Sequence, residues 1–205
     1  MKIKSRIGIL GGSFDPVHWG HILLAREALR LANLDFVLLL AAKDPPHKEV
    51  QTSPTDRFRM AYLAAEGEAG IYASDLELKM FGKSYTVDTM RELKHHFPDA
   101  ELFYLIGSDV LASLPYWYKS EELMSLIKIL CVARQSVWEP EPDTVLKMPE
   151  WQKIPIQIIH THIPAISSSE IRSRLRKGLP ISSYVPKPVE KYIRDNGLYQ
   201  KNFSL

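Results

Sequence analysis

The stretch Ile7-Gly-Ile-Leu-Gly-Gly-Ser-Phe-Asp-Pro-Val-His-Trp-Gly-His21 is the most informative part of the chain. It begins as a short apolar run, typical of a parallel strand, and passes through a glycine pair into a helical pattern from about 19 to 33. His18 and His21 then lie at the first helical turn, where unpaired backbone N–H groups attract anions. The sequence therefore predicts a phosphate-binding turn, which we define as residues 11–21.

Three interpretations of the histidine pair follow from its residues alone. In the first, His18 and His21 are a helix cap and a core residue. In the second they are a pair of metal ligands, and in the third they are two groups that face a phosphate. No Cys ligand, His-Glu-x-x-His motif or acidic cluster completes a zinc set. Gly20 costs a helix about 1 kcal/mol relative to Ala, which is reasonable if a side chain there would collide with a phosphate. The phosphate interpretation is favoured.

Short apolar runs alternate with helical patterns along the rest of the chain. Ser53 and Pro54 are typical of a helix start, and Gly197 is typical of the position after a helix end. This alternation predicts an α/β fold, a doubly wound Rossmann-like parallel sheet. We expect one domain over 1–205, with an α/β core to about 165 and a helical C-terminal portion over about 166–205. The expected strands are 6–10, 36–41, 102–106, 127–133 and 156–160, and the later helices follow Pro54 and Ser84 and span 168–177 and 186–196.

Composition narrows the class of protein. The chain has 205 residues, 45% of them hydrophobic, which is enough for a sizeable core. Its 26 basic and 24 acidic residues leave a charge of +2, which does not indicate nonspecific nucleic-acid binding. Cys131 lies in an apolar run and is expected to be a buried strand residue. The absence of a long apolar segment or a signal-peptide pattern predicts a cytoplasmic protein without a membrane partner.

Two other nucleotide-binding motifs are excluded. The chain has no Gly-x-Gly-x-x-Gly, so a dinucleotide redox cofactor is unsupported. Gly82-Lys83-Ser84 is similar to the end of a P-loop, but position 77 is Glu rather than Gly. The residues 136–153, which prolines interrupt, are expected to be a surface excursion.

A second anion site is predicted in the segment Ile166–Arg172. Ser167 and Glu170 have the spacing of a capping box, which explains helix initiation. Ser168, Ser169 and Arg172 also converge on this helix start, where hydroxyls, backbone N–H groups and a guanidinium suit phosphate oxygens.

Three further segments follow expected strands or contain aromatic clusters. Pro45-Pro46-His47-Lys48 follows the second strand and is either a stiff exposed turn or a binding loop. Gly107-Ser108-Asp109 follows a later strand. Ser108 or Asp109 is a plain helix cap, or else Asp109 contacts a ribose or influences a bound metal. Trp117 lies in Leu-Pro-Tyr-Trp-Tyr, which is either core or a stacking surface.

The order and spacing of these motifs resemble the bacterial nicotinate-mononucleotide adenylyltransferases, nucleotidyltransferases with a His-x-Gly-His motif. The resemblance covers nearly the whole chain and is carried by 11–21, 45–48, 107–109, Trp117 and 166–172. It implies transfer of the AMP moiety of ATP to nicotinate mononucleotide, with pyrophosphate released, in NAD biosynthesis. It also implies Mg²⁺ bound with ATP.

The resemblance further implies a role for each matching residue. His18, His21 and Arg172 would be catalytic. The groups expected to contact ATP are Gly11, Gly12, Ser13, Phe14, Gly20, Gly107, Asp109, Ser168 and Ser169, and those expected to contact the acceptor are His47, Lys48, Tyr85, Thr86 and Trp117.

The chain departs from the resembled pattern after Arg134, where Gln135-Ser136 replaces a common Pro-Gly, and any role of Arg134 is left open. Other functions are an adenylyltransferase for nicotinamide mononucleotide or phosphopantetheine, or a noncatalytic nucleotide-binding regulator. A homo-oligomer is possible, since the C-terminal portion is helical.

Overall fold

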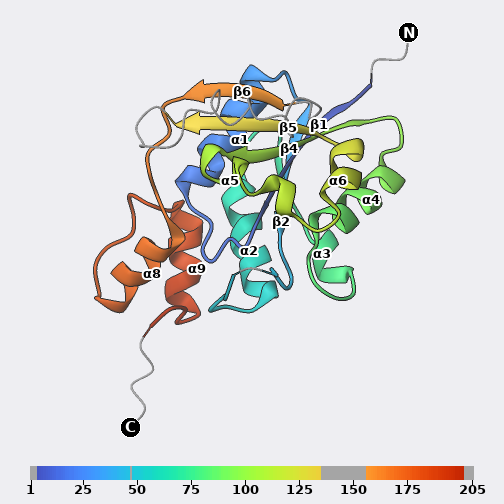
Figure 1. The fold of residues 1–205 in the computed structure, drawn as a ribbon. Helices are drawn as coiled ribbons and strands as arrows, with labels where there is room; N and C mark the ends of the chain where they lie inside the picture. Colours follow the sequence, from blue (N-terminus) through green and yellow to red (C-terminus); the bar gives the residue numbers. More distant parts are fainter. Residues whose placement is uncertain (1–3, 47, 135–155, 201–205) are drawn as a thin grey trace.

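A six-stranded parallel sheet is the centre of the computed structural model, which describes residues 4–46, 48–134 and 156–200 (Figure 1). The strand order is β3-β2-β1-β4-β5-β6, so the direction of winding reverses between β1 and β4. Gly8 of β1 lies opposite Val37 on one side and Phe103 on the other. This arrangement confirms the predicted doubly wound sheet, whose ligand crevice lies beyond the carboxyl ends of β1 and β4. The strands are β1 (Arg6–Gly12), β2 (Phe36–Ala41), β3 (Ile71–Ser74), β4 (Glu101–Gly107), β5 (Lys128–Arg134) and β6 (Ile156–Thr161).

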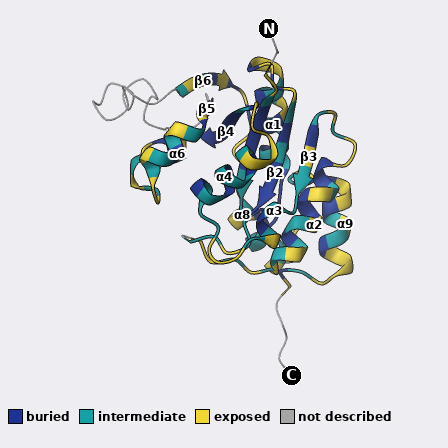
Figure 2. Cartoon of the chain, turned by 90° about the vertical axis from the view of Figure 1, so that its right-hand side faces the viewer, coloured by how far each residue is buried: buried dark blue, intermediate teal, exposed yellow. Residues whose placement is uncertain are grey.

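Helices and their buried side chains form two apolar cores with the sheet. Ile22, Met60 and Val189 belong to one core, and Met90 and Leu123 belong to the other. Figure 2 shows the strands as mostly buried, with exposed residues on the outer faces of the helices. The helices are α1 (Trp19–Leu31), α2 (Pro54–Ala65), α3 (Leu76–Lys79), α4 (Thr86–His96), α5 (Ser108–Leu111), the 3₁₀ helix η1 (Leu114–Tyr116), α6 (Ser120–Leu126), α8 (Ser168–Arg176) and α9 (Lys187–Asp195).

Predicted helix ends agree with the structure. Ser53 Oγ accepts a hydrogen bond from the Asp56 N–H at 3.1 Å, with Pro54 at the first helical position. Gly197 follows α9 with φ of +61°, a conformation that glycine adopts at low cost. Cys131 is fully buried in β5, as expected. These signals are local, which is why the sequence alone identifies them.

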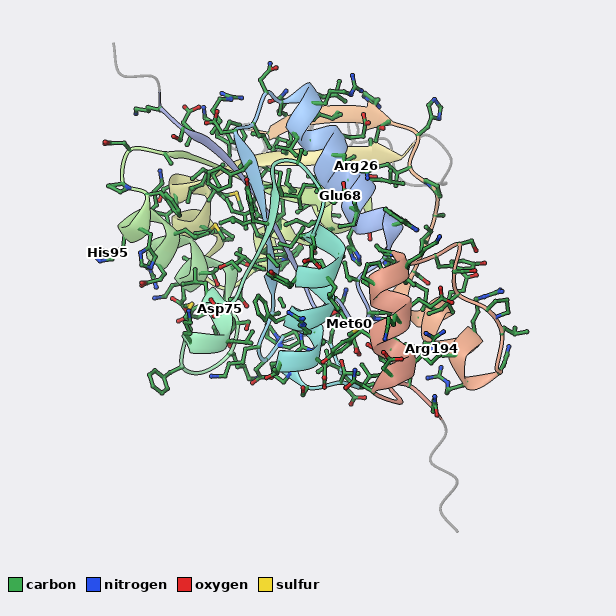
Figure 3. The ribbon with its side chains drawn as sticks, turned by 180° about the vertical axis from the view of Figure 1, so that it is seen from behind. Arg26, Met60, Glu68, Asp75, His95 and Arg194 are labelled. Atoms are coloured by element: carbon green, nitrogen blue, oxygen red, sulfur yellow. The ribbon has the colours of Figure 1, made fainter. Side chains whose placement is uncertain are left out.

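An ion pair ties α1 to the turn before β3. Arg26 and Glu68 point toward each other (Figure 3), and their Nε–Oε2 and Nη2–Oε1 distances are 2.6 and 2.7 Å. The pKa of the Arg26 guanidinium is raised, chiefly by this hydrogen bond. The contact holds the amino-terminal end of β3, a strand of only four residues, at the edge of the sheet.

Several elements were not predicted. The strand β3 is short and only one of its residues is buried, so it has neither the apolar run nor the alternation of a predictable strand. The helix expected after Ser84 is α4, and Phe97 is its C-cap and 37% exposed. The expected surface excursion over 136–153 lies outside the described residues. The single-domain division likewise stays a prediction.

No helix in the described part of the chain combines the length and the apolar character that crossing a membrane requires.

Candidate active site

The phosphate-binding turn begins where β1 ends and leads into α1. His18 is the N-cap of α1, and its backbone N–H donates to Nδ1 of His21 at 3.2 Å. The two imidazoles stack with centroids 3.6 Å apart, and the Phe14 ring meets His21 edge-on at 5.0 Å. Because Nδ1 of His21 accepts a hydrogen bond, a neutral His21 carries its proton on Nε2. The turn thus fixes both the orientation and the tautomer of this side chain.

The glycines of this turn lie in close contact with neighbouring side chains. A Cβ on Gly20 would lie 3.0 Å from His18 Nδ1, so the His18 ring gives a more immediate reason for glycine than the expected phosphate. A Cβ on Gly11 would lie 2.5 Å from the Tyr104 hydroxyl oxygen. The small residues therefore let the His18 ring and the Tyr104 hydroxyl approach the backbone of the turn.

Asp15 ties the turn to two distant segments. Its carboxylate is buried and accepts hydrogen bonds from the Gln51 N–H, the Thr52 hydroxyl and the Tyr199 hydroxyl, each at 2.7 Å. Burial and the neighbouring Asp15 carboxylate raise the pKa of Tyr199, so its hydroxyl keeps its proton and donates it. Sequence reasoning missed this cluster, because the three donors lie far from Asp15 in the chain.

The start of α8 lies against the same turn. Ser167 caps the helix by accepting from the Glu170 N–H at 3.1 Å, as expected. The Ser168 hydroxyl donates to the Pro16 carbonyl at 2.9 Å, and Arg172 Nη1 donates to the Asp15 carbonyl at 2.7 Å. Arg172 Nη2 also donates to the Ser169 hydroxyl at 3.2 Å. The structure thus brings the predicted α8 residues to the turn that contains the histidine pair.

A buried arginine lies behind the turn. Arg57 of α2 is fully buried and donates hydrogen bonds to the backbone carbonyls of Ser13, Ala42, Lys43 and Thr52. Sequence reasoning missed it, since a single Arg in an amphipathic helix is usually exposed.

The carboxyl edge of the sheet also forms a cavity of about 200 Å³, which we call the aromatic cavity. Of the residues predicted to bind the acceptor, it contains Lys48, Tyr85, Thr86 and Trp117. His18, His21 and Arg172 do not line it, although the turn contributes its first residues. The lining residues are Gly11, Gly12, Ser13, Ala42, Pro45, Pro46, Lys48, Glu77, Ser84, Tyr85, Thr86, Tyr104, Trp117 and Tyr118.

Aromatic contacts shape this cavity. The rings of Tyr104 and Trp117 meet edge-on at 5.8 Å, and those of Tyr85 and Tyr118 lie 4.4 Å apart. Trp117 Nε1 donates to the Ser113 hydroxyl at 3.1 Å, which fixes the indole while leaving its side chain partly exposed. Burial raises the pKa of Tyr104 to about 12, so its hydroxyl stays protonated. The cavity therefore offers π-faces and hydroxyls to a ligand.

One acid in the aromatic cavity was not predicted. Glu77 of α3 is buried, and its Oε1 accepts a hydrogen bond from the Thr89 hydroxyl at 2.9 Å. Burial raises the pKa of this carboxyl, while hydrogen bonds from Ser84 and Thr89 and the charge of Arg57 oppose the shift. The short helix that carries Glu77 has no sequence signal of its own.

The remaining predicted residues lie elsewhere or are not described. Gly107 is the N-cap of α5, so a cap at Ser108 or Asp109 is the wrong alternative. Asp109 is exposed at the carboxyl edge of the sheet. Phe14 is 1% exposed, so its ring is not available to stack on a nucleotide. His47 and Gln135-Ser136 lie outside the described residues, as does the side chain of Arg134.

Residues 9–174 match the family model described as cytidylyltransferase-like. The chain belongs to this family. A probable nicotinate-nucleotide adenylyltransferase from Shouchella clausii is 41% identical over 96% of this chain and 98% of its own. One from Thermus thermophilus is 39% identical over 95% of this chain and 100% of its own.

A solved structure of similar fold is that of Plasmodium falciparum nicotinic acid mononucleotide adenylyltransferase complexed with NaAD. It has a TM-score of 0.78 and 22% identity, and the match covers 95% of this chain and 97% of that one. At this identity the likeness shows the fold, a parallel sheet with helices on both sides.

Proposed function

We infer that the protein transfers the AMP moiety of ATP to nicotinate mononucleotide, giving nicotinate adenine dinucleotide and pyrophosphate in NAD biosynthesis. The observation that carries this inference is the junction of two parts at Gly11, Gly12 and Ser13. On one side lie the histidine pair and the start of α8, and on the other lies the aromatic cavity. The relatives named nicotinate-nucleotide adenylyltransferase and the P. falciparum complex with NaAD support it.

The reaction is an in-line attack by the phosphate of the mononucleotide on the α-phosphorus of ATP. A phosphate oxygen forms the new P–O bond, and the bond to the β-phosphate oxygen breaks as pyrophosphate leaves. The attacking phosphate is largely ionised near pH 7, so neither a protein nucleophile nor a strong base is needed. Catalysis then consists of positioning and charge stabilisation.

His21 is proposed to donate from Nε2 to the phosphates of ATP. Its Nδ1 is occupied by the His18 N–H at 3.2 Å, which leaves Nε2–H as the donor of the neutral ring. His18 supports that orientation through the stacked ring. The proposed contribution of His21 is therefore a fixed hydrogen bond to oxygens on which charge develops.

Arg172 and the start of α8 are proposed to bind the β- and γ-phosphates. The guanidinium already contacts the Asp15 carbonyl and the Ser169 hydroxyl, and these contacts fix its plane beside the turn. Ser168 and Ser169 add hydroxyls at the amino end of a nine-residue helix, where backbone N–H groups favour anions. Gly107 and Asp109, at the end of β4, are proposed to contact the nucleoside of ATP.

The aromatic cavity is proposed to bind the acceptor. The exposed part of Trp117 offers a stacking face for the pyridine ring, and the backbone N–H groups at the start of α4 offer donors to its carboxylate. Tyr85 is the N-cap of α4 and Thr86 is its first residue, and both line the cavity. Lys48, exposed at the rim, and His47 are proposed to contact the acceptor phosphate.

Mg²⁺ is proposed to accompany ATP. In residues 4–46, 48–134 and 156–200, no group of three or more His, Cys, Asp or Glu side chains has the arrangement of a metal site. Mg²⁺ is often held mainly by phosphate oxygens and water, so the proposal does not need a dedicated set of protein ligands. The ion would neutralise charge on the triphosphate. Asp109 is an exposed carboxylate at the carboxyl edge of the sheet.

One assay tests the function. Purified protein is given ATP and Mg²⁺ with nicotinate mononucleotide, nicotinamide mononucleotide or phosphopantetheine in parallel, and pyrophosphate is quantified. The proposal expects the fastest release with nicotinate mononucleotide. Faster release with another acceptor would overturn the substrate, and no release with any acceptor would favour a noncatalytic regulator. A cytoplasmic location, the absence of nucleic-acid binding and a homo-oligomer stay predictions from the sequence.

A further inference from the structure

Arg57 is a buried cation whose described hydrogen bonds all go to backbone carbonyls. Nη1 donates to Ser13 at 2.9 Å and also to Ala42, Nη2 donates to Lys43 at 2.9 Å, and Nε donates to Thr52 at 3.3 Å. These carbonyls belong to the turn after β1, the end of β2 and the loop before α2. Removing a guanidinium from water is costly unless its donors are satisfied, and here one side chain joins the turn after β1 to both ends of the connection between β2 and α2.

The hydrogen bonds of Arg57 also set the direction of the peptide groups that it contacts. In a trans peptide the C=O and the following N–H point in opposite directions. When Arg57 holds the carbonyls of Ala42 and Lys43, the next N–H groups must point away from it. They do, because the N–H groups of Lys43 and Asp44 donate to the Ser84 hydroxyl at 2.9 and 3.2 Å.

The same rule applies to the peptide between Ser13 and Phe14. Arg57 holds the Ser13 carbonyl, so the Phe14 N–H points away from the guanidinium. Among the described residues none accepts a hydrogen bond from this N–H. Phe14 also has φ of +48°, a conformation that residues with a Cβ rarely adopt. A strained residue, whose N–H points away from Arg57 toward the side of the turn opposite the guanidinium, thus lies between the aromatic cavity and the histidine pair.

The charge of Arg57 adds to this arrangement. Burial lowers the pKa of its guanidinium, while Asp15, Tyr199 and Glu77 oppose the shift, and an arginine stays protonated near neutral pH. No described residue forms an ion pair with it. Asp15, the acid whose charge acts on it most, already accepts its own hydrogen bonds.

We propose that Arg57 is a positioning residue, which aims the Phe14 N–H at a substrate phosphate and places positive charge beneath the turn. The proposal rests on the proposed function, since it needs a phosphate above the turn. Arg57 itself does not touch the substrate. It acts through the Ser13 carbonyl, whose hydrogen bond turns the whole peptide group.

The first test compares Arg57→Lys with Arg59→Lys. Lysine keeps the charge but cannot hold four carbonyls in the planar arrangement of a guanidinium. Arg59 is two residues away on the same helix, is exposed and serves as the matched control. At a temperature where each variant is folded by circular dichroism, we expect Arg57→Lys to lower kcat/KM on the order of 100-fold. We expect Arg59→Lys to behave as the wild type. A folded Arg57→Lys with wild-type kcat/KM would overturn the proposal.

The second test uses the wild-type chain and needs no variant. The backbone amide of Phe14 is followed by NMR while inorganic pyrophosphate is added until the rise in Tm saturates. We expect its proton resonance to move downfield, as it does when an amide begins to donate to an anion. An unmoved resonance at saturation would contradict the proposal, whether or not Arg57→Lys folds. An inactive wild type would instead contradict the proposed function.

Discussion

The phosphate-binding turn and the aromatic cavity meet at Gly11, Gly12 and Ser13 but are built differently. The turn is one continuous segment of backbone, imidazoles and small residues, with the start of α8 held against it by hydrogen bonds. The cavity is assembled from side chains on α3, α4, β4 and the segment after η1, with one buried acid among aromatic rings. The turn is suited to charge that develops during reaction, and the cavity is suited to the shape of a planar ring. Substitutions in the phosphate-binding turn should therefore impair turnover. Substitutions in the aromatic cavity should impair the choice and the binding of the acceptor.

The largest effect is expected from His21→Ala. Loss of the Nε2 donor should lower kcat by about 100- to 1,000-fold, the usual result of removing a fixed donor to developing charge. The KM for the acceptor should stay close to that of the wild type. Steady-state pyrophosphate release measures both constants. His96→Ala, which removes an exposed imidazole on α4, is the control. Near-wild-type turnover of folded His21→Ala would show that the turn takes no part in catalysis.

Trp117→Ala, a substitution in the aromatic cavity, should have a smaller effect. Losing the stacking face should raise the KM for nicotinate mononucleotide roughly 10-fold, the size of one aromatic contact. The KM for ATP should hardly change. Tyr116→Ala is the matched control, because that neighbouring ring is 87% exposed and does not line the cavity. Equal increases in both KM values would show that the two parts do not act separately.

Tyr199→Phe tests whether the C-terminal segment supports the turn. The change removes one of three hydrogen bonds to the Asp15 carboxylate and should cost about 1 kcal/mol or more of unfolding free energy. Because Asp15 belongs to the turn, kcat should fall a few-fold as well. Tyr192→Phe removes a similar hydroxyl contact to Asp56 at 2.8 Å, away from the turn. It should lower stability without lowering kcat, and matching kcat losses in the two variants would refute the link.

The smallest effect is a pH dependence in the aromatic cavity. Burial raises the folded-state pKa of Glu77 above its ordinary 4.5, so the folded chain binds this proton more readily than the unfolded chain. The unfolding free energy should therefore fall as pH rises from about 4.5 through the folded pKa, and Glu77→Gln should reduce that fall. Glu101→Gln is a control of opposite sign. Lys128 lowers the pKa of Glu101. The contribution of Glu101 to the unfolding free energy is therefore lost as pH falls below 4.5. Urea denaturation at several pH values measures both slopes, and identical slopes in wild type and Glu77→Gln would contradict the assignment.

The two parts also differ in how far the sequence predicts them. The turn is contiguous, so strand, glycines and histidines appear in order, and the Ser53 and Ser167 caps are signalled by neighbours three residues away. The double winding of the sheet follows from the same local alternation and was predicted.

The rest depends on distant contacts. Arg57 has the sequence context of an exposed helix residue, and only the fold surrounds it with carbonyls. Glu77 lies in a four-residue helix, too short for a periodic pattern, and its burial depends on α4 and β2. Tyr199 reaches Asp15 across 184 positions of the chain. No local pattern carries such information.

A crystal structure with nicotinate adenine dinucleotide bound would test the division of the site most directly. We expect the pyridine ring in the aromatic cavity against Trp117, and the phosphates of the product beside the Phe14 N–H and His21. A pyridine ring outside that cavity, or phosphates remote from the phosphate-binding turn, would contradict this division.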